Sequence, residues 1–173
     1  MKRHILFSIL LLLVSISSAQ ENPERFKIKT GASFHRTALW RGPIAHVAGR
    51  LTLDYFVSKN VEVGIYGAYI EYKSDFDHSP DTPLATYGME LNYHFFPYLQ
   101  KTKEHSWDLY ISGKLGGYYA FFPETWQTVT RKHRLDYGAY LGLGYSFSNY
   151  LAPYLEIGYG ELCIMELGLS FTF

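Results

Sequence analysis

Two serine–histidine pairs are the residues of this chain whose types and spacing come nearest to a hydrolytic site. Ser33 and His35 stand two residues apart, and His105 and Ser106 are adjacent. A hydrolase of this kind needs a serine that is activated by a histidine, and an acidic residue that orients the imidazole. Neither pair shows the geometry that a catalytic site requires. We therefore expect no catalytic residue.

The histidines and acidic residues do not form a recognisable metal-binding motif. The histidines are scattered along the chain and lack the short, regular spacing of zinc ligands. His78 lies in the acidic segment 75–81 (DFDHSPD), whose oxygen atoms could attract a cation. That segment lacks the ligand spacing of a calcium loop, so a solvated surface loop is the better interpretation. We expect no metal and no cofactor.

The remaining charged residues alternate with apolar ones, and this alternation indicates strands. In segment 135–147, LDYGAYLGLGYSF, every second residue is apolar or aromatic, and the residues between are polar or glycine. A helix would mix these two sets and would carry three interior glycines, each costing about 1 kcal/mol relative to alanine. The same period of two recurs in eight segments: 26–35, 46–57, 61–72, 84–96, 107–120, 135–147, 152–160 and 162–173.

The connections between these segments differ in length. Segments 36–45, 73–83 and 121–134 are long and polar, whereas 58–60 and 148–150 are tight turns. The strands meet or exceed the roughly 9–11 residues with which a tilted strand crosses a bilayer. Long loops on one side and short turns on the other are typical of outer-membrane barrels. We predict an all-β fold: an eight-stranded antiparallel up-and-down transmembrane β-barrel.

Charges, glycines and aromatic residues predict which face of the barrel turns outward. Charged residues share their face with nine glycines, as a crowded barrel interior requires, because a missing side chain makes room for a large one. Aromatic residues make up 18% of the chain and gather near both ends of the strands, which is expected for girdles at two lipid–water interfaces. We predict an apolar outer face. A soluble, lipocalin-like barrel with its apolar face inward is the alternative.

The inward face is predicted to hold a network of charges. The interior of an eight-stranded barrel is just wide enough for its own side chains, and a buried charge without a partner is costly. We therefore expect a salt-bridged polar plug, with a narrow gated path for ions or small solutes as the alternative. The predicted network comprises Lys29, Arg50, Glu90, Lys114, Glu156 and Glu166.

Two residues need separate treatment. Glu71 falls on the apolar face near a loop, and we expect a bulge or a strand end there. Cys163 is the single cysteine, which excludes an intramolecular disulfide. Its position predicts a small apolar side chain that points to lipid.

Residues 1–19 have the pattern of a cleaved secretory signal peptide. Lys2 and Arg3 precede a short apolar stretch that is about half the roughly 20 residues of a membrane-spanning helix. Residues 20–173 then form one barrel domain. Without Lys2 and Arg3, the 16 Lys+Arg fall to 14 against 16 Asp+Glu, a balance that does not indicate a nucleic-acid partner. We expect an exported monomer.

The last segment, MELGLSFTF, ends the chain on an alternation of apolar and polar residues. With the strand pattern, it resembles the small eight-stranded outer-membrane β-barrels of the OmpA transmembrane-domain and OmpX type. In that family the barrel assembly machinery reads a terminal aromatic residue and the alternating apolar residues before it. The resemblance implies a bacterial outer-membrane location among lipid and lipopolysaccharide, and no cell-wall tether is expected. It assigns the assembly signal to Leu167, Leu169, Phe171 and Phe173.

Some barrels of this size act on lipid A, and an enzyme of that kind is the third functional interpretation. The deacylases carry a His-x-Ser order on the lipid-facing surface, whereas Ser33 and His35 have the reverse order and are predicted to face inward. We favour a structural or surface-interaction role, with an extracellular ligand that the sequence does not identify. Residue types favoured in contacts occur in the predicted loops at Trp40, Arg41, Phe76, Trp126, Arg131 and Lys132.

Overall fold

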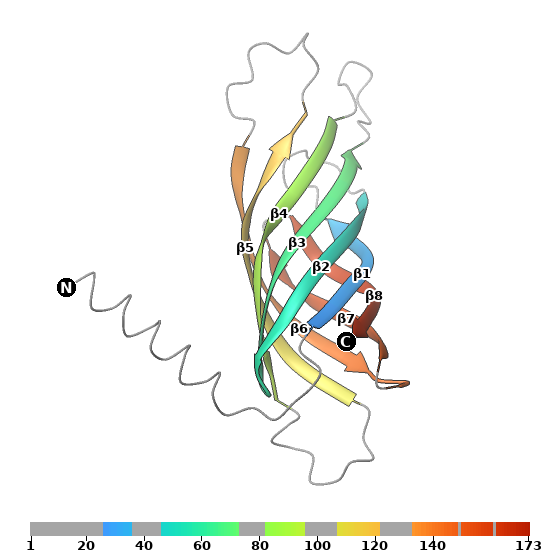
Figure 1. Ribbon diagram of the computed structural model, residues 1–173. Coiled ribbons are helices and arrows are strands. Elements are labelled where there is room, and N and C mark those ends of the chain that lie inside the picture. The colour runs from blue at the N-terminus through green and yellow to red at the C-terminus, as the bar shows by residue number, and fades with distance from the viewer. Residues whose placement is uncertain are drawn as a thin grey trace, which may run out of the picture.

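The computed structural model of the chain is a closed barrel of eight antiparallel strands in sequence order (Figure 1). The structure describes residues 26–35, 46–72, 82–95, 107–121, 133–148, 150–160 and 162–173. The strands are β1 (Phe26–His35), β2 (His46–Ser58), β3 (Val61–Tyr72), β4 (Thr82–His94), β5 (Trp107–Ala120), β6 (His133–Tyr145), β7 (Leu151–Gly160) and β8 (Cys163–Thr172). The predicted fold class is confirmed, and every strand end lies within two residues of its prediction. No helix in the described part of the chain is long and apolar enough to cross a membrane.

The first and last strands pair with each other and close the barrel. β1 lies between β2 and β8 (Figure 1). Its register with β8 is continuous from Lys27 opposite Thr172 to Phe34 opposite Met165. Phe26 and Phe173 exchange backbone hydrogen bonds of 3.2 and 2.8 Å at the start of this seam. The ladder therefore leaves β1 and β8 without the unpaired edge on which other chains could add strands.

The two ends of the barrel differ, and we name them the turn end and the loop end. The turn end, at the bottom of Figure 1, holds the connections 58–61 and 146–151 together with Phe26 and Phe173. In each of these connections a serine, Ser58 or Ser148, accepts hydrogen bonds from the backbone N–H groups two and three residues further on, at 3.1–3.3 Å. Such side-chain acceptors favour tight turns. At the loop end β3 finishes and β4 begins.

The outer face of the barrel is predominantly apolar. In β2, for example, Leu51 and Leu53 are exposed, while Arg50, Thr52 and Asp54 are buried. Exposed apolar residues of this kind occur from Ile65 in β3 to Leu169 in β8. The predicted outward-apolar orientation is confirmed, and the alternative of a barrel with its apolar face inward is wrong.

Aromatic rings pack against one another at both ends of the barrel. At the turn end the rings of Trp107 and Tyr145 lie 4.7 Å apart, and those of Tyr93 and Phe95 lie 5.3 Å apart. At the loop end Tyr119 packs against Phe121 with a centroid distance of 4.7 Å. These two bands match the expected interfacial girdles.

Inward glycines make room for inward tyrosines, as the sequence predicts. A Cβ atom at Gly142 would overlap the ring of Tyr110, its register partner on β5. A Cβ atom at Gly138 would likewise collide with the ring of Tyr140 two residues further on. Large side chains therefore lie flat over bare backbone, and this fills a narrow bore.

Glu71 and Cys163 are the two residues whose orientation the sequence analysis treated separately. β3 and β4 stay in continuous register to Tyr72, so exposed Glu71 lies at the strand end, one of the two expected explanations. The prediction that Cys163 faces lipid is wrong, because this residue is buried. The register against β1 shifts between Phe34 and His35, where β8 contains one extra residue. This bulge reverses the alternation of β8, so that Ile164 is exposed and Cys163 points inward.

Candidate functional site

All six residues predicted for the charge network lie inside the barrel. Each comes from a strand in which the neighbouring residues point outward, so the alternation of the backbone turns the charged side chain into the bore. They derive from six different strands and are all at least nine-tenths buried. By strand order they are Lys29, Arg50, Glu90, Lys114, Glu156 and Glu166.

Lys114 and Arg50 tie opposite walls of the barrel together. The Lys114 ammonium pairs with Glu156 and lies 3.0 Å from Glu166 Oε2 and 3.7 Å from Glu90 Oε2. Arg50 Nε lies 3.2 Å from Glu166 Oε2, and an Arg50 terminal nitrogen lies 3.4 Å from Glu90 Oε2. Since these partners sit on β2, β4, β5, β7 and β8, the ion pairs cross the bore.

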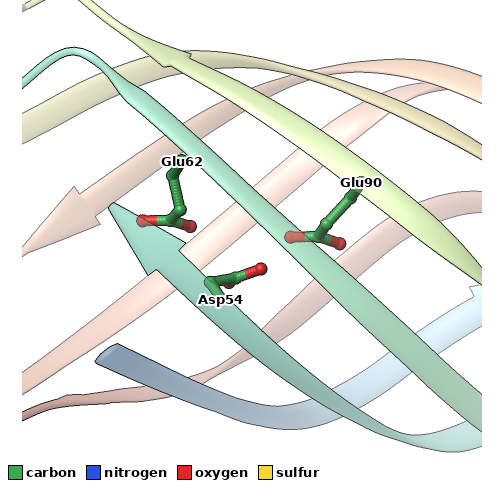
Figure 2. A group of neighbouring side chains, drawn as sticks. All are labelled: Asp54, Glu62 and Glu90. Atoms are coloured by element: carbon green, nitrogen blue, oxygen red, sulfur yellow. The ribbon is translucent and has the colours of Figure 1, made fainter. Parts of the chain in front are cut away.

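A second group of carboxylates surrounds Lys29 nearer the turn end. Asp54, Glu62 and Glu90 come from β2, β3 and β4, and their carboxylates point toward a common space (Figure 2). The Lys29 ammonium pairs with Glu90 and lies 3.0 Å from Asp54 Oδ2, 3.6 Å from Glu62 Oε1 and 3.8 Å from Glu156 Oε1. Sequence reasoning left Asp54 and Glu62 out of the network. The sequence nevertheless indicated that Glu62 faces inward, because it precedes inward Gly64 by two positions and residues two apart in a strand share a face.

These three carboxylates have a spacing that metal ions use. One oxygen from each of Asp54, Glu62 and Glu90 lies within 4.8 Å of the others, the one such group among the described residues. The Lys29 ammonium is in ion-pair contact with all three. Because a buried cluster of negative charge needs a compensating cation, we interpret Lys29 as the positive charge of this group.

Tyrosine hydroxyls donate further hydrogen bonds to the buried carboxylates. Tyr154 donates to Glu166 Oε1 at 2.7 Å, and Tyr110 donates to Glu156 Oε1 at 2.9 Å. The Arg50 guanidinium stacks 4.0 Å from the centre of the Tyr66 ring. Hydrogen bonds to charged groups contribute about 1.5–3 kcal/mol each, so these tyrosines stabilise the charged interior as well as filling it.

At the turn end the network reaches residues that contact water. His94 Nδ1 lies 2.9 Å from both carboxylate oxygens of Asp108, and His94 Nε2 lies 3.4 Å from Glu62 Oε2. Lys27 pairs with Glu62 at 2.6 Å. The side chains of Lys27 and Asp108 are 12% and 32% exposed, against 3% or less for Lys29 and Glu90. Exposure thus rises from the centre toward this end.

The loop end of the interior contains an apolar cluster, which the sequence analysis did not predict. Ile70 and Leu84 are register partners on β3 and β4, and Leu84 in turn pairs with Ala120 on β5. Their side chains belong to one buried cluster, whose full membership is Ala48, Ala68, Ile70, Leu84, Tyr118, Ala120 and Leu162.

The serine–histidine pair lies beside this apolar cluster. Ser33 Oγ and His35 Nε2 share a hydrogen bond of 2.8 Å, and both residues are buried inside the barrel. Ser33 is in register with Ala48 on one side and Glu166 on the other. His105 and Ser106 lie outside the described residues, as do His78 and the six predicted loop-contact residues Trp40, Arg41, Phe76, Trp126, Arg131 and Lys132.

The predicted assembly-signal residues are placed on the outer face of β8. Leu167, Leu169 and Phe173 are exposed, and Phe171 is half-buried at the turn end. They alternate with inward Glu166, so one strand carries both a lipid-facing stripe and an ion-pair residue.

Comparisons with solved structures identify the fold. No protein-family model matches the chain, and no curated protein matches it in sequence. The structure of neisserial surface protein A superposes with a TM-score of 0.59 at 13% identity, covering 88% of this chain and 98% of that one. The N-terminal β-barrel domain of Pseudomonas aeruginosa OprF gives 0.52 at 18% identity, covering 87% and 99%. Ail, the attachment invasion locus protein of Yersinia pestis, gives 0.51 at 16% identity, covering 87% and 97%.

These matches and the apolar exterior define the class of protein. The chain has the fold of the small eight-stranded outer-membrane β-barrels. At such low identity the likeness concerns the fold, and function must be argued from the site.

Proposed function

We propose that this protein is a non-conducting outer-membrane barrel with a structural or surface-interaction role, its interior filled by a polar plug. The observation that carries the proposal is the set of ion pairs across the bore. Lys114 on β5 and Arg50 on β2 bind carboxylates of β4, β7 and β8, so these ion pairs join five of the eight strands across the middle of the bore. A barrel of eight strands has no width to spare for such side chains and a water column together.

Planar-bilayer conductance of residues 20–173, refolded in detergent, tests this proposal. Folding is verified on the same sample by a shift of the gel band on boiling. We expect a folded barrel without resolvable current steps. Reproducible steps from the unmodified barrel, with the band shift intact, would contradict the plug.

The proposal includes location, export and assembly. We infer that residues 1–19 are removed on export, and that the mature monomer lies in the outer membrane among lipid and lipopolysaccharide. The barrel assembly machinery would read the outward stripe Leu167, Leu169, Phe171 and Phe173. The apolar exterior and the aromatic bands support this location, since outer-membrane barrels carry an apolar outer band with aromatic girdles at both membrane interfaces.

The proposed surface-interaction role is supported by the contact-type residues of the predicted loops and by the names of two proteins that share the fold. Two of the similar structures are named as a surface protein and as an attachment invasion locus protein. A variant whose segments 36–45, 73–81 and 122–132 are replaced by glycine–serine linkers tests this part. Bacteria displaying either form are compared for adhesion to cultured epithelial cells. Reduced adhesion of the variant is expected, and equal adhesion would restrict the role to a structural one.

A narrow path for ions is the second candidate, and one observation favours it. Thr52 Oγ1, Asn92 Oδ1 and Ser112 Oγ are buried in the bore and have no hydrogen-bond partner among the described residues. Polar groups of this kind are what a permeating ion would need in exchange for its hydration shell. Current steps whose size changes in an Arg50→Gln barrel would select this candidate over the plug.

We propose no enzymatic role. Ser33 is fully buried beside the apolar cluster, so an ester would have to enter the bore before it could meet Ser33 Oγ. An unchanged lipid A mass profile in cells that overproduce the protein is the expected result.

A further inference from the structure

The interior of this barrel consists of two parts of opposite character. From the turn end to the middle it is charged, with Lys29, Arg50 and Lys114 facing carboxylates. At the loop end it holds an apolar layer, made by the seven residues of the buried cluster described above, with the hydrogen-bonded Ser33–His35 pair beside it. Ile70, Leu84 and Leu162 supply its largest aliphatic side chains, and each is 3% exposed or less.

The apolar layer spans the bore from wall to wall. Ile70 and Leu84 belong to β3 and β4, whereas Leu162 lies in the connection between β7 and β8. β7 and β8 lie on the other side of the closed barrel from β3 and β4 in the strand order. Since Leu162 belongs to the same cluster as Ile70 and Leu84, this cluster extends across the bore.

The two ends of the charged part are therefore unequal. Toward the turn end, the network continues to Lys27 and Asp108, whose side chains are partly exposed. Toward the loop end, the next inward side chains after Arg50 on β2 and after Gly116 on β5 are Ala48 and Tyr118, which are buried and belong to the apolar cluster. One further carboxylate, that of Asp136 on β6, is buried on this side and accepts a hydrogen bond of 3.3 Å from the Tyr66 hydroxyl. A small apolar cavity stays dry, and an ion that enters it loses hydration without gaining a ligand.

We propose that the apolar layer, rather than the charge network, is the barrier to ions, and that the network forms a polar chamber reached only from the turn end. This inference rests on the proposed non-conducting barrel and adds the position of the barrier. Hydrophobic constrictions close pores because water leaves them, and no charged gate is then required. Exchange of partners among the ion pairs would open no path while the layer is intact.

The charge of the chamber predicts what would pass once the layer is opened. Among the described residues, the ion pairs of the network join four Lys and Arg side chains to five carboxylates. This count excludes His94 and Asp108, which lie at the turn end. The cations are Lys27, Lys29, Arg50 and Lys114, and the carboxylates are Asp54, Glu62, Glu90, Glu156 and Glu166. An excess of negative charge in a narrow pore favours cations. The opened barrel should therefore conduct K⁺ in preference to Cl⁻.

The test is planar-bilayer conductance in KCl with four refolded barrels: unmodified, Leu84→Ser/Leu162→Ser, Leu91→Ser/Leu167→Ser and Arg50→Gln. The first pair of changes makes opposite sides of the layer polar. The second pair changes the same residue type on β4 and β8, but at positions that are 53% and 52% exposed on the outer face. A band shift on boiling must show that each barrel is folded. Leu84→Ala/Leu162→Ala, which widens the layer without burying hydroxyls, replaces the serine pair if that pair does not fold.

We expect current steps in the layer variants alone. In a KCl gradient their reversal potential should show selectivity for K⁺ over Cl⁻. Silence of folded layer variants would overturn the inference while leaving the plug proposal intact. Steps in Arg50→Gln with the layer unchanged would also overturn it, because the network would then be the gate. Steps in the unmodified barrel would instead refute the proposed non-conducting function. Equal conduction of K⁺ and Cl⁻, or steps in the outer-face variant, would place the current outside the chamber and reject the inference.

Discussion

The carboxylate of Asp54 lies directly over the bare backbone of Gly64 on the neighbouring strand. The two residues are register partners of β2 and β3, and a Cβ atom at position 64 would overlap Asp54 Oδ1 and come within 2.8 Å of the Leu53 carbonyl oxygen. The absent side chain at Gly64 thus gives Asp54 the room to reach Lys29 at 3.0 Å. A glycine on one strand determines an ion pair made by another.

Gly64→Ala is therefore expected to destabilise the barrel. The added methyl group pushes Asp54 away from Lys29 and presses on backbone, and overpacking of this kind costs about 1–3 kcal/mol. The measurement is the free energy of unfolding from urea titration in lipid vesicles. Gly49→Ala is the matched control, because nothing lies within 4 Å of a Cβ atom there, and its effect should stay within about 0.5 kcal/mol. Equal effects of the two changes would refute the proposed role of Gly64.

Lys29→Met should be among the most damaging single changes in the network. It leaves Asp54, Glu62 and Glu90 without their shared cation, and breaking a buried ion pair from one side costs about 3–5 kcal/mol. Urea titration measures the loss, with Lys59→Met in the exposed turn as the control. Adding Asp54→Asn to Lys29→Met should recover part of the stability, because it removes one uncompensated charge. A double variant that is as unstable as the sum of the single changes would show that the two residues are not coupled.

Tyr154→Phe separates the hydrogen bonds of the tyrosines from their bulk. The change keeps the ring but removes the 2.7 Å hydrogen bond to Glu166, for which we expect a loss of about 1.5–3 kcal/mol. Tyr159→Phe on the same strand is the control, since Tyr159 is on the outer face and 67% exposed. Urea titration of both variants is the measurement. If Tyr154→Phe matched its control, the tyrosines would be filling space without stabilising the carboxylates.

A charge on the outer face tests whether that face is in lipid. Met89 is 67% exposed in the middle of β4, and Met89→Lys should cost about 2–4 kcal/mol in a bilayer. Tyr150 is 64% exposed but lies in a turn at the turn end, where Tyr150→Lys should cost about 0–1 kcal/mol. Unfolding free energies in vesicles compare the two. A similar small cost at both positions would argue against a membrane-spanning exterior.

Phe173→Ala tests the assembly signal apart from stability. The backbone pairing of residue 173 with Phe26 does not use the side chain, so refolding in detergent should remain complete. In cells, we expect less heat-modifiable barrel in the outer membrane, because the assembly machinery would lose its terminal aromatic. Phe147→Ala removes another exposed aromatic at the turn end and serves as the control. Undiminished assembly of Phe173→Ala would remove this residue from the signal.

The alternation of side chains along each strand was sufficient to predict the barrel and its polarity. A period of two is a local property of the backbone, so Arg50 and Leu51 could be assigned to opposite faces without knowledge of any neighbour. The same argument placed Lys29, Glu90, Lys114 and the other predicted charges on the inner face.

Which inward side chains meet was decided by the tertiary structure. Lys29 reaches Asp54, Glu62 and Glu90 because strand register and tilt bring these residues of β1, β2, β3 and β4 to one height in the bore. The alternation of side chains along a strand does not reveal its register with distant strands. The single extra residue in β8 turns Cys163 inward, since a bulge reverses the alternation behind it. The apolar layer arises in the same way. Pairing of β3 with β4 makes Ile70 and Leu84 neighbours, and closure of the barrel brings Leu162 into the same cluster.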